Sequence, residues 1–345
     1  MSETSRLQPQ LCLRMAEIPV ALDWTHDGHF LAVGGADGET VVFDTVEDRV
    51  VSRIQAHARG LFQLAWQPRG SRLLTCGQDG AARLWTLADG VLSLTAELEM
   101  EHAWVEHCAW QPAGTCFAVA AGRVARVFDA NGGLLQREVS FAGGTISALG
   151  WRPQGAQLAL AGYQGVALYS PADPRGGIRK LPWSGAMVSL AWRPDGSVIA
   201  CGCQDSSVHF WRLRESKEAW MSGYETKPKH LAWSRDGEWL ATSGSWDVTL
   251  WRFRKGSPEG TSPTTLRRHR APLRALAFAP KGRRLVSGCE GGLVCLWDQL
   301  EDFVAPSAVV ALDAGVESVA FSPKGAGLRL AAGDANGGVH LLTAQ

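Results

Sequence analysis

A repeat of about 43 residues runs along the whole chain and limits its fold more than any other feature. In each of eight copies, a short apolar run ends in an aromatic residue, here called the anchor, and Gly follows four residues later. The anchors are Trp24, Trp66, Trp110, Trp151, Trp192, Trp233, Phe278 and Phe321. Successive anchors are 42, 44, 41, 41, 41, 45 and 43 residues apart, so one structural unit recurs along all 345 residues.

Each copy continues with residues that are typical of strands and turns. A second apolar run, such as residues 73–75, is followed by a Gly/Asp turn, such as residues 78–80, and by a third run. The third runs end at Phe43, Trp85, Phe128, Tyr169, Trp211, Trp251, Trp297 and, in the eighth copy, Leu342. The runs are four to six residues long and none has sustained helical periodicity. The sequence therefore predicts an all-β chain whose sheets are buried on both faces.

This pattern resembles that of the WD-repeat β-propeller family over essentially the whole chain. Trp297-Asp298 reproduces the Trp-Asp pair that names the family, and Phe43-Asp44 and Phe128-Asp129 are close variants. The resemblance implies a propeller of four-stranded antiparallel blades. Eight copies predict one domain over residues 1–345 with eight blades. The alternative is seven blades with one degenerate repeat, but no copy lacks an anchor.

The two ends of the sequence predict how the last blade is completed. No fourth run follows Leu342, whereas an additional apolar segment, residues 11–13, precedes the first anchor. We expect a strand at about residues 10–16 to form the outer strand of the last blade. Closure of this kind is common in the family that the chain resembles.

The resemblance also implies a structural hydrogen-bond network within a blade. It joins a His before the first strand, a Ser or Thr on the second, an Asp in the next turn and a Trp ending the third. The second copy contains the full set: His57, Thr75, Asp79 and Trp85. The same residue types would suit a hydrolase, but fragments recur in other copies, such as His269 and Ser287. We therefore expect the set to satisfy buried polar groups and not to be catalytic.

No other motif predicts catalysis, a cofactor or a metal. The chain has no phosphate-binding P-loop, no G-x-S-x-G, no H-E-x-x-H and no C-x-x-C. Cys201 and Cys203 point to one face of a predicted strand, where buried free thiols are the expected role. We expect a non-enzymatic protein without a cofactor. A small-ligand site, a metal site or an enzyme in the central channel is kept as an alternative.

Charge and the N-terminal sequence bear on location and partners. Thirty-four basic and 34 acidic residues give a net charge of zero, which provides no attraction for nucleic acid or an anionic membrane. The N-terminus has no apolar signal segment and no window resembles a membrane span. We expect a cytoplasmic, monomeric ring. Basic residues between Arg252 and Arg274 flank a loop rich in Pro, Ser, Thr and Gly, so a phosphate or nucleic-acid binder is the second alternative.

Partners of the family often dock where loops surround the central channel. Positions four and six before an anchor, and the turns between second and third strands, are expected there. They give the candidates Phe62, Gln78, Trp104, Glu106, Tyr163, Gln204, Lys227, Lys229, Trp246, Arg274, Glu290 and Glu317, and Trp183 and Tyr224 lie slightly earlier in their connections. Trp, Tyr and Arg most often carry the binding energy of interfaces. The leading hypothesis is a scaffold that binds a protein or peptide on this face.

Overall fold

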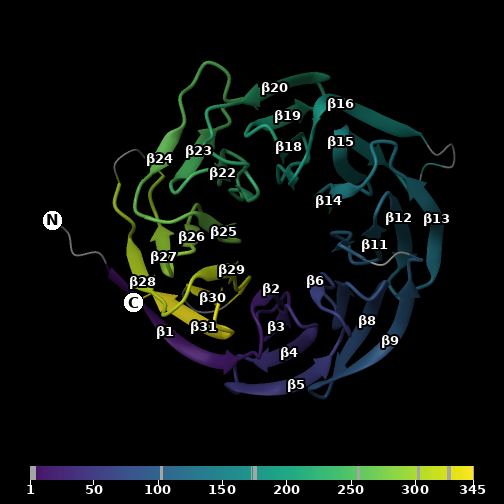
Figure 1. The fold of residues 1–345 in the computed structure, drawn as a ribbon, viewed down its shortest axis with the longest axis vertical. Helices are drawn as coiled ribbons and strands as arrows, with labels where there is room; N and C mark the ends of the chain where they lie inside the picture. The colour runs from purple at the N-terminus through teal and green to yellow at the C-terminus, as the bar shows by residue number, and fades with distance from the viewer. Residues whose placement is uncertain are drawn as a thin grey trace. The chain divides into compact units, whose positions relative to one another are not determined.

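The computed structural model describes residues 5–101, 104–171, 173, 177–254, 257–300, 304–324 and 328–344. Every helix or strand assigned in these ranges is a β-strand. The strands form eight antiparallel blades, so the prediction of an eight-bladed β-propeller is confirmed (Figure 1). The chain divides into two compact units, one of residues 12–184 with blades one to four, the other of residues 1–11 and 185–345 with blades five to eight.

The first unit holds four sheets in which strands pair in sequence order. Blade one consists of β2 (Pro19–Trp24), β3 (Phe30–Gly35), β4 (Glu39–Asp44) and β5 (Arg49–Gln55). Blade two consists of β6 (Leu61–Trp66), β7 (Arg72–Gly77), β8 (Ala81–Ala88) and β9 (Val91–Glu99). Blade three consists of β10 (His107–Trp110), β11 (Cys116–Ala121), β12 (Val124–Asp129) and β13 (Leu134–Ser140). Blade four consists of β14 (Ile146–Trp151), β15 (Leu158–Tyr169) and β16 (Ile178–Ala186). β15 supplies two strands of blade four, because it turns at Gln164 and Gly165, whose φ angles are 70° and 110°.

The second unit repeats this order. Blade five consists of β17 (Ala191–Trp192), β18 (Val198–Gly202), β19 (Val208–Arg212) and β20 (Lys217–Met221). Blade six consists of β21 (Leu231–Trp233), β22 (Trp239–Thr242), β23 (Val248–Arg252) and β24 (Thr264–Leu266). Blade seven consists of β25 (Leu273–Phe278), β26 (Leu285–Cys289), β27 (Leu293–Trp297) and β28 (Ala308–Ala311). Blade eight consists of β29 (Val316–Phe321), β30 (Arg329–Asp334), β31 (Gly338–Ala344) and the N-terminal strand β1 (Ser5–Arg14).

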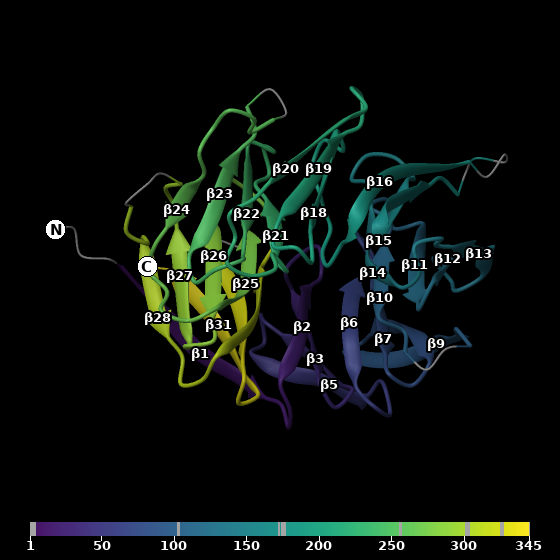
Figure 2. The ribbon, with the colours of Figure 1, turned by 45° about the horizontal axis from the view of Figure 1, so that its top comes forward.

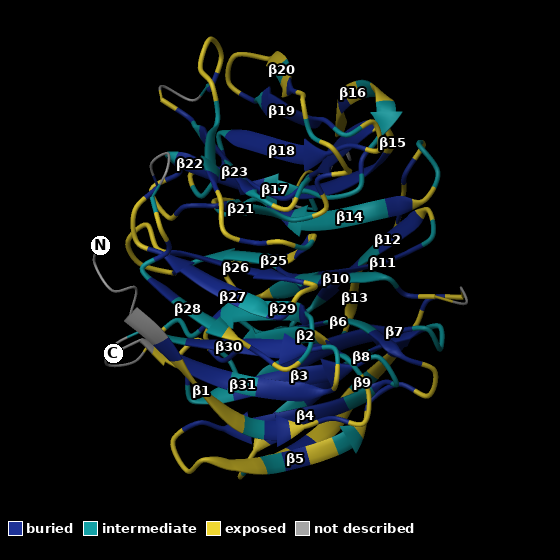
Figure 3. Ribbon diagram, turned by 60° about the vertical axis from the view of Figure 1, so that its left-hand side comes forward, coloured by how far each residue is buried: buried dark blue, intermediate teal, exposed yellow. Residues whose placement is uncertain are grey.

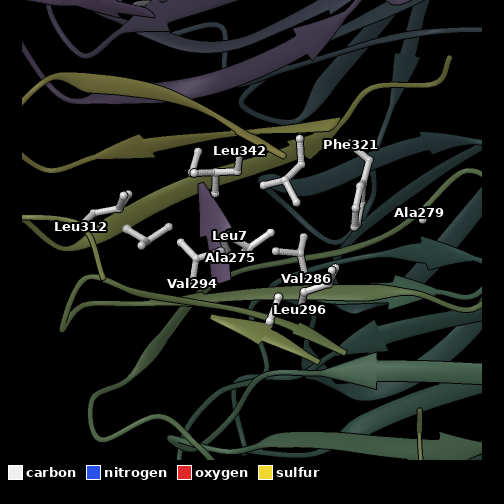
Figure 4. Close-up of a cluster of buried hydrophobic side chains, with 13 residues drawn as sticks. Leu7, Ala275, Ala279, Val286, Val294, Leu296, Leu312, Phe321 and Leu342 are labelled. Atoms are coloured by element: carbon white, nitrogen blue, oxygen red, sulfur yellow. The ribbon is translucent and has the colours of Figure 1, made fainter. Parts of the chain in front are cut away.

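The N-terminal strand β1 completes blade eight, as predicted. The strand order β28-β1-β31 places it beside the last strand of blade eight and also beside the last strand of blade seven, with which it pairs in parallel. Leu7 of β1 is buried in an apolar cluster with Val294, Leu312 and Leu342 (Figure 4). β1 begins at Ser5, five residues before the expected start, because Leu7 is the one large apolar side chain in its polar first half.

Burial follows the position of a strand in its blade. In blade one, β3 and β4 are buried along almost their whole length, whereas β5 is largely exposed (Figure 3). The middle strands consist of small and branched apolar residues that pack on both faces. The middle strands of blade one therefore agree with the expectation of sheets buried on both faces.

The anchor Trp side chains join neighbouring blades. The indole N–H of Trp110 donates to the carbonyl of Ala65 at 3.1 Å, and that of Trp151 donates to Ala109 at 3.0 Å. The accepting residue in each case directly precedes the anchor of the preceding blade. In the second unit, Trp233 donates in the same way to Ala191 at 3.3 Å. Trp is therefore selected at anchors for its apolar ring and for its donor.

Blades one and two are joined by a different hydrogen bond. Among the described residues, the buried indole N–H of Trp66 has no hydrogen-bond partner. The buried carboxylate of Asp23 instead accepts from the backbone N–H of Trp66 at 2.7 Å and from that of Trp24 at 2.9 Å. Burial raises the pKa of Asp23 to about 6, against the opposing effect of these two hydrogen bonds.

The predicted polar network of blade two is a continuous chain of hydrogen bonds. His57 Nδ1 lies 2.8 Å from Asp79 Oδ1, His57 Nε2 lies 2.9 Å from Thr75 Oγ1, and the Trp85 indole donates to that hydroxyl at 3.0 Å. Arg83 also donates to Asp79 at 2.7 Å. Burial lowers the pKa of His57, so its ring is neutral at pH 7. Each polar side chain of this network has a hydrogen-bond partner within the blade, so the four residues have a structural role.

Replacing Trp151 by Phe removes the inter-blade hydrogen bond and leaves the Ala109 carbonyl without that donor. We expect the free energy of unfolding to fall by about 1 kcal/mol more than for Trp66→Phe, because the Trp66 indole donates to no described residue. Both substitutions remove similar apolar area, so Trp66→Phe is the matched control. Urea unfolding followed by tryptophan fluorescence and circular dichroism measures the difference, and equal losses would contradict the role given to the donor.

The network of blade two also predicts a dependence of stability on pH. Burial alone would raise the pKa of Asp79, but hydrogen bonds from His57 and Arg83 outweigh it and lower the pKa to about 2. Ionised Asp79 therefore stabilises the fold above about pH 4, and this contribution is lost as pH falls toward 2. Asp79→Asn should be less stable than the wild type at pH 7, with a difference that shrinks between pH 4 and pH 3 in urea titrations. A constant difference would contradict the assignment.

Candidate functional site

The strands of a blade are antiparallel, so its successive turns lie alternately at two opposite edges of the blade. The turns between second and third strands share one edge with the connections that enter the first strand; we call this the connection edge. The turns that follow the anchors lie at the opposite edge. In the first unit, Gln78 and Trp104 lie at the connection edge, and in the second unit Lys229 and Glu290 do so. The sequence-based partner candidates are therefore found at one kind of edge.

A groove at the connection edge of blades five, six and seven brings four of the candidates together. Its volume is about 430 Å³, and Lys227, Lys229, Arg274 and Glu290 line it. Both Lys side chains are exposed and lie in the connection from β20 to β21. The other lining residues are Ser206, Glu225, Thr226, His230, Ser243, Gly244, Ser245, Pro272 and Leu273.

The charges in this groove are unequally paired. Arg274 forms an ion pair with Glu290, with 2.6 Å between Nη2 and Oε1. Burial, reinforced by the charges of Lys229 and Arg274, lowers the pKa of His230 to about 4, so the ring is neutral at pH 7. Lys227 and Lys229 are then opposed only by Glu225 among the remaining lining residues. The groove therefore offers two exposed ammonium groups beside several hydroxyls.

Three further candidates of this unit lie outside the lining of the groove. Trp246 follows the lining residue Ser245 in the β22–β23 turn, and its side chain is 55% exposed. Gln204 is exposed in the corresponding turn of blade five. Glu317 lies half-buried on β29 of blade eight. Trp246 is thus an exposed aromatic residue directly beside the groove.

Tyr224 has a structural role in blade six that the sequence did not indicate. Its hydroxyl lies 2.8 Å from Thr242 Oγ1 and accepts from the Trp251 indole at 2.7 Å. In blade two, His57 contacts the Thr75 hydroxyl and the Trp85 indole donates to that same hydroxyl. In blade six, Tyr224 takes the place of the family's His, and the indole donates to Tyr224 in place of the threonine. Burial raises the pKa of Tyr224 to about 12. Its hydroxyl is therefore committed to the blade and is not a docking group.

The first unit presents aromatic side chains at its own connection edge. Trp104 is 55% exposed and packs edge-on against Phe62, with 5.9 Å between ring centroids. Phe62 is anchored beneath by the cluster of blades two and three. Burial raises the pKa of Glu106, which lies two residues after Trp104. The Phe62–Trp104 pair is an apolar platform held in place from below.

The remaining candidates of the first unit do not converge on one site. Gln78 is half-buried, and its backbone N–H donates to Gly60 at 2.9 Å. Tyr163 is exposed at the turn within β15. Trp183 is half-buried on β16. These side chains lie at the same kind of edge as the Phe62–Trp104 pair.

The basic residues between Arg252 and Arg274 do not form one patch. Arg252 ends β23 at the opposite edge of blade six, whereas Arg274 lines the groove at the connection edge of blade seven. Arg252 pairs with Glu238 at 2.6 Å and Arg267 lies 3.7 Å from Asp247. The separation of these cations, and their pairing, does not fit the alternative of a single nucleic-acid surface in this region.

No group of three or more His, Cys, Asp or Glu side chains in the part of the chain that the structure describes is placed to hold a metal ion. Likewise, no helix of the described residues is long and apolar enough to cross a membrane.

Sequence reasoning missed the residues that lie between the predicted candidates. Ser206, His230 and Ser245 line the groove but stand one or two positions from Gln204, Lys229 and Trp246. Selecting every residue of each connection, and not two positions per repeat, would have included them. The convergence of blades five to seven on one groove has no signal in the sequence.

Family models match four segments of the chain. The "WD domain, G-beta repeat" matches residues 178–212, 220–251 and 260–298. The "Anaphase-promoting complex subunit 4 WD40 domain" matches residues 15–67. The matches therefore fall in both units, within blades one, two, four, five, six and seven.

Curated relatives include THO complex subunit 3 of Arabidopsis thaliana, 22% identical over 83% of this chain and 76% of that protein. Guanine nucleotide-binding protein subunit beta-1 of Nicotiana tabacum is 26% identical over 76% of this chain and 62% of that protein. The chain spans only 26% of Periodic tryptophan protein 2 of A. thaliana.

Among solved structures, the computationally designed Ika8 protein is similar in fold, with a TM-score of 0.79 and 18% sequence identity over 96% of this chain and 97% of that chain. The repeat matches, the relatives and the eight blades agree with the resemblance seen in the sequence. The chain is therefore a WD-repeat β-propeller protein.

Proposed function

We propose that the protein is a non-enzymatic scaffold that binds a protein or peptide partner at the connection edge of its blades. The observation that carries the proposal is the groove of blades five to seven, where Lys227, Lys229, Arg274 and Glu290 meet. WD-repeat propellers are typically scaffolds for protein–protein interaction and are generally not enzymes.

The chemistry of the groove suits a peptide that carries carboxylates. Lys227 and Lys229 are exposed and offer charge to an acidic side chain, while Ser206 offers a hydroxyl to a backbone. Trp246, beside the groove, supplies the rigid aromatic area on which interfaces often depend. The neutral His230 adds no charge at physiological pH.

Three expectations belong to the same proposal. A scaffold that acts through its loops needs no catalytic group and no cofactor. We also propose that the chain acts as a monomer, as a single domain and in the cytoplasm. Size-exclusion chromatography with light scattering and fractionation of cells would test these points separately.

Reversing two charges tests the groove. The double variant Lys227→Glu/Lys229→Glu should release partners that bind through acidic segments, because it replaces attraction by repulsion. Lys281→Glu/Lys324→Glu is the matched control, since both residues are exposed in turns at the opposite edge. Affinity capture from native lysate, quantified by mass spectrometry at two salt concentrations, compares the three proteins. Partners lost with both double variants would contradict a role of the groove.

A second substitution tests the aromatic platform of the first unit. Trp104→Ala should leave the unfolding midpoint nearly unchanged, because 55% of the side chain is exposed, but should weaken capture of a partner that covers this edge. Trp220→Ala is the control, since Trp220 is 62% exposed on β20, the outer strand of blade five. If Trp104→Ala and Lys229→Ala leave every captured protein bound, the connection edge is not the docking surface.

A further inference from the structure

A second pocket lies at the opposite edge of blades six and seven, under the connection from β23 to β24. That connection extends beyond the ends of both strands (Figure 2). The pocket has a volume of about 620 Å³, and the buried Trp239 lies at its base. Arg252, Arg254 and Arg283 line it, and Ser262 of the connection lies at its margin.

The lining of this pocket has an excess of positive charge. Asp298 is the one carboxylate among the lining residues and is paired with Arg284 at 2.7 Å. Arg283 is paired with Asp236 at 2.6 Å and with Glu238. Arg252 is held by Glu238 and by the Trp239 ring, whose centroid is 5.2 Å from the guanidinium carbon. Arg254 forms no ion pair with any described residue. One guanidinium is therefore available to an anion.

The connection that covers the pocket is held by hydrogen bonds at residues 258–261. Thr261 donates to the carbonyl of Pro258 through its backbone N–H at 3.0 Å and through its hydroxyl at 2.6 Å. Glu259 accepts from Arg212 of blade five at 3.1 Å. Residues 261–263, which follow this turn, have no regular structure. Ser262 is thus presented in an extended segment between a fixed turn and β24.

Ser262 also differs from the other Ser-Pro dipeptides of the chain. The hydroxyl of Ser170 accepts from Gln157, that of Ser257 accepts from the backbone of Glu259, and that of Ser322 donates to the carbonyl of Lys324. All three of these Ser residues are half-buried. Ser262 is exposed, its hydroxyl makes no hydrogen bond to a described residue, and Pro263 follows it. Ser-Pro in an accessible segment is what proline-directed protein kinases accept.

We propose that Ser262 is a phosphorylation site and that the pocket lined by Arg252, Arg254 and Arg283 receives its phosphate. The phosphoryl donor is ATP and the catalyst is a proline-directed Ser/Thr kinase. The bond between the β,γ-bridging oxygen and the γ-phosphorus breaks, and a bond from Ser262 Oγ to that phosphorus forms. The hydroxyl proton passes to a base of the kinase, and ADP leaves.

The phosphate would change how the connection is held. It carries a charge of about −1.5 to −2 at pH 7 and three strong acceptor oxygens. Arg pairs with such a group in a bidentate manner, and Arg254 has no carboxylate partner among the described residues to give up. Phosphorylation therefore closes the connection onto blades six and seven, at the edge opposite the partner groove.

The test begins with the folded full-length chain, Mg-ATP and a purified proline-directed kinase. Mass spectrometry should locate phosphate at Ser262; Ser262→Ala should remove it, and Ser257→Ala, the matched Ser-Pro control, should not. Endoproteinase Glu-C then cuts after the exposed Glu259. We expect this cut to be severalfold slower in the phosphorylated protein than in the unmodified one.

The Arg side chains supply the second arm of the test. Arg254→Gln should be phosphorylated to the same extent but should lose the protection, whereas Arg267→Gln, an exposed control that follows β24, should keep it. Phosphate at Ser257 or at none of these positions would overturn the modification site. Equal cleavage with and without phosphate would overturn the role of the pocket. Protection of the unmodified protein by inorganic phosphate alone would overturn Ser262 as the source of the anion.

Discussion

The hydrogen bond from an anchor indole to the preceding blade is the interaction that fixes blades three, four and six on their neighbours. A blade satisfies its own backbone through its ladder, but apolar faces alone do not fix where one blade sits on the next. Trp110 and Trp151 each place a large ring between two blades and direct its N–H at one carbonyl. Phe lacks this donor, and Tyr carries its polar group at the far end of the ring. This requirement accounts for much of the excess of 15 Trp over three Tyr.

Because the inner strands carry the packing, the edges of the blades are free to differ in chemistry. The connection edge of blades five to seven has two exposed Lys side chains and a paired Arg274. The opposite edge of blades six and seven has an Arg-lined pocket over Trp239. Both edges are built on the same strands, so substitutions in either leave the ladder intact. One rigid scaffold thus presents two separate polar surfaces.

The sequence predicted the repeat-based features and missed those that arise between repeats. Fold class, blade count and the use of the N-terminal strand follow from spacing, because eight aligned anchors leave few alternatives. The early start of β1 was missed because residues 5–10 are mostly polar and only the burial of Leu7 explains it. Tyr224 was assigned to the rim because a phenol replaces the imidazole that the repeat leads one to expect. The groove depends on three blades meeting in space, which periodicity along one chain does not encode.

The position of β1 between β28 and β31 has a consequence for how the chain folds. β1 pairs with strands that are synthesised about 300 residues after it. Until blades seven and eight exist, Leu7 and the edges of β1 have no partner in that sheet. Such a long sequence separation makes closure a late and slow event. The exposed β1 edge is then the stretch most open to a chaperone or to exchange with another copy during synthesis.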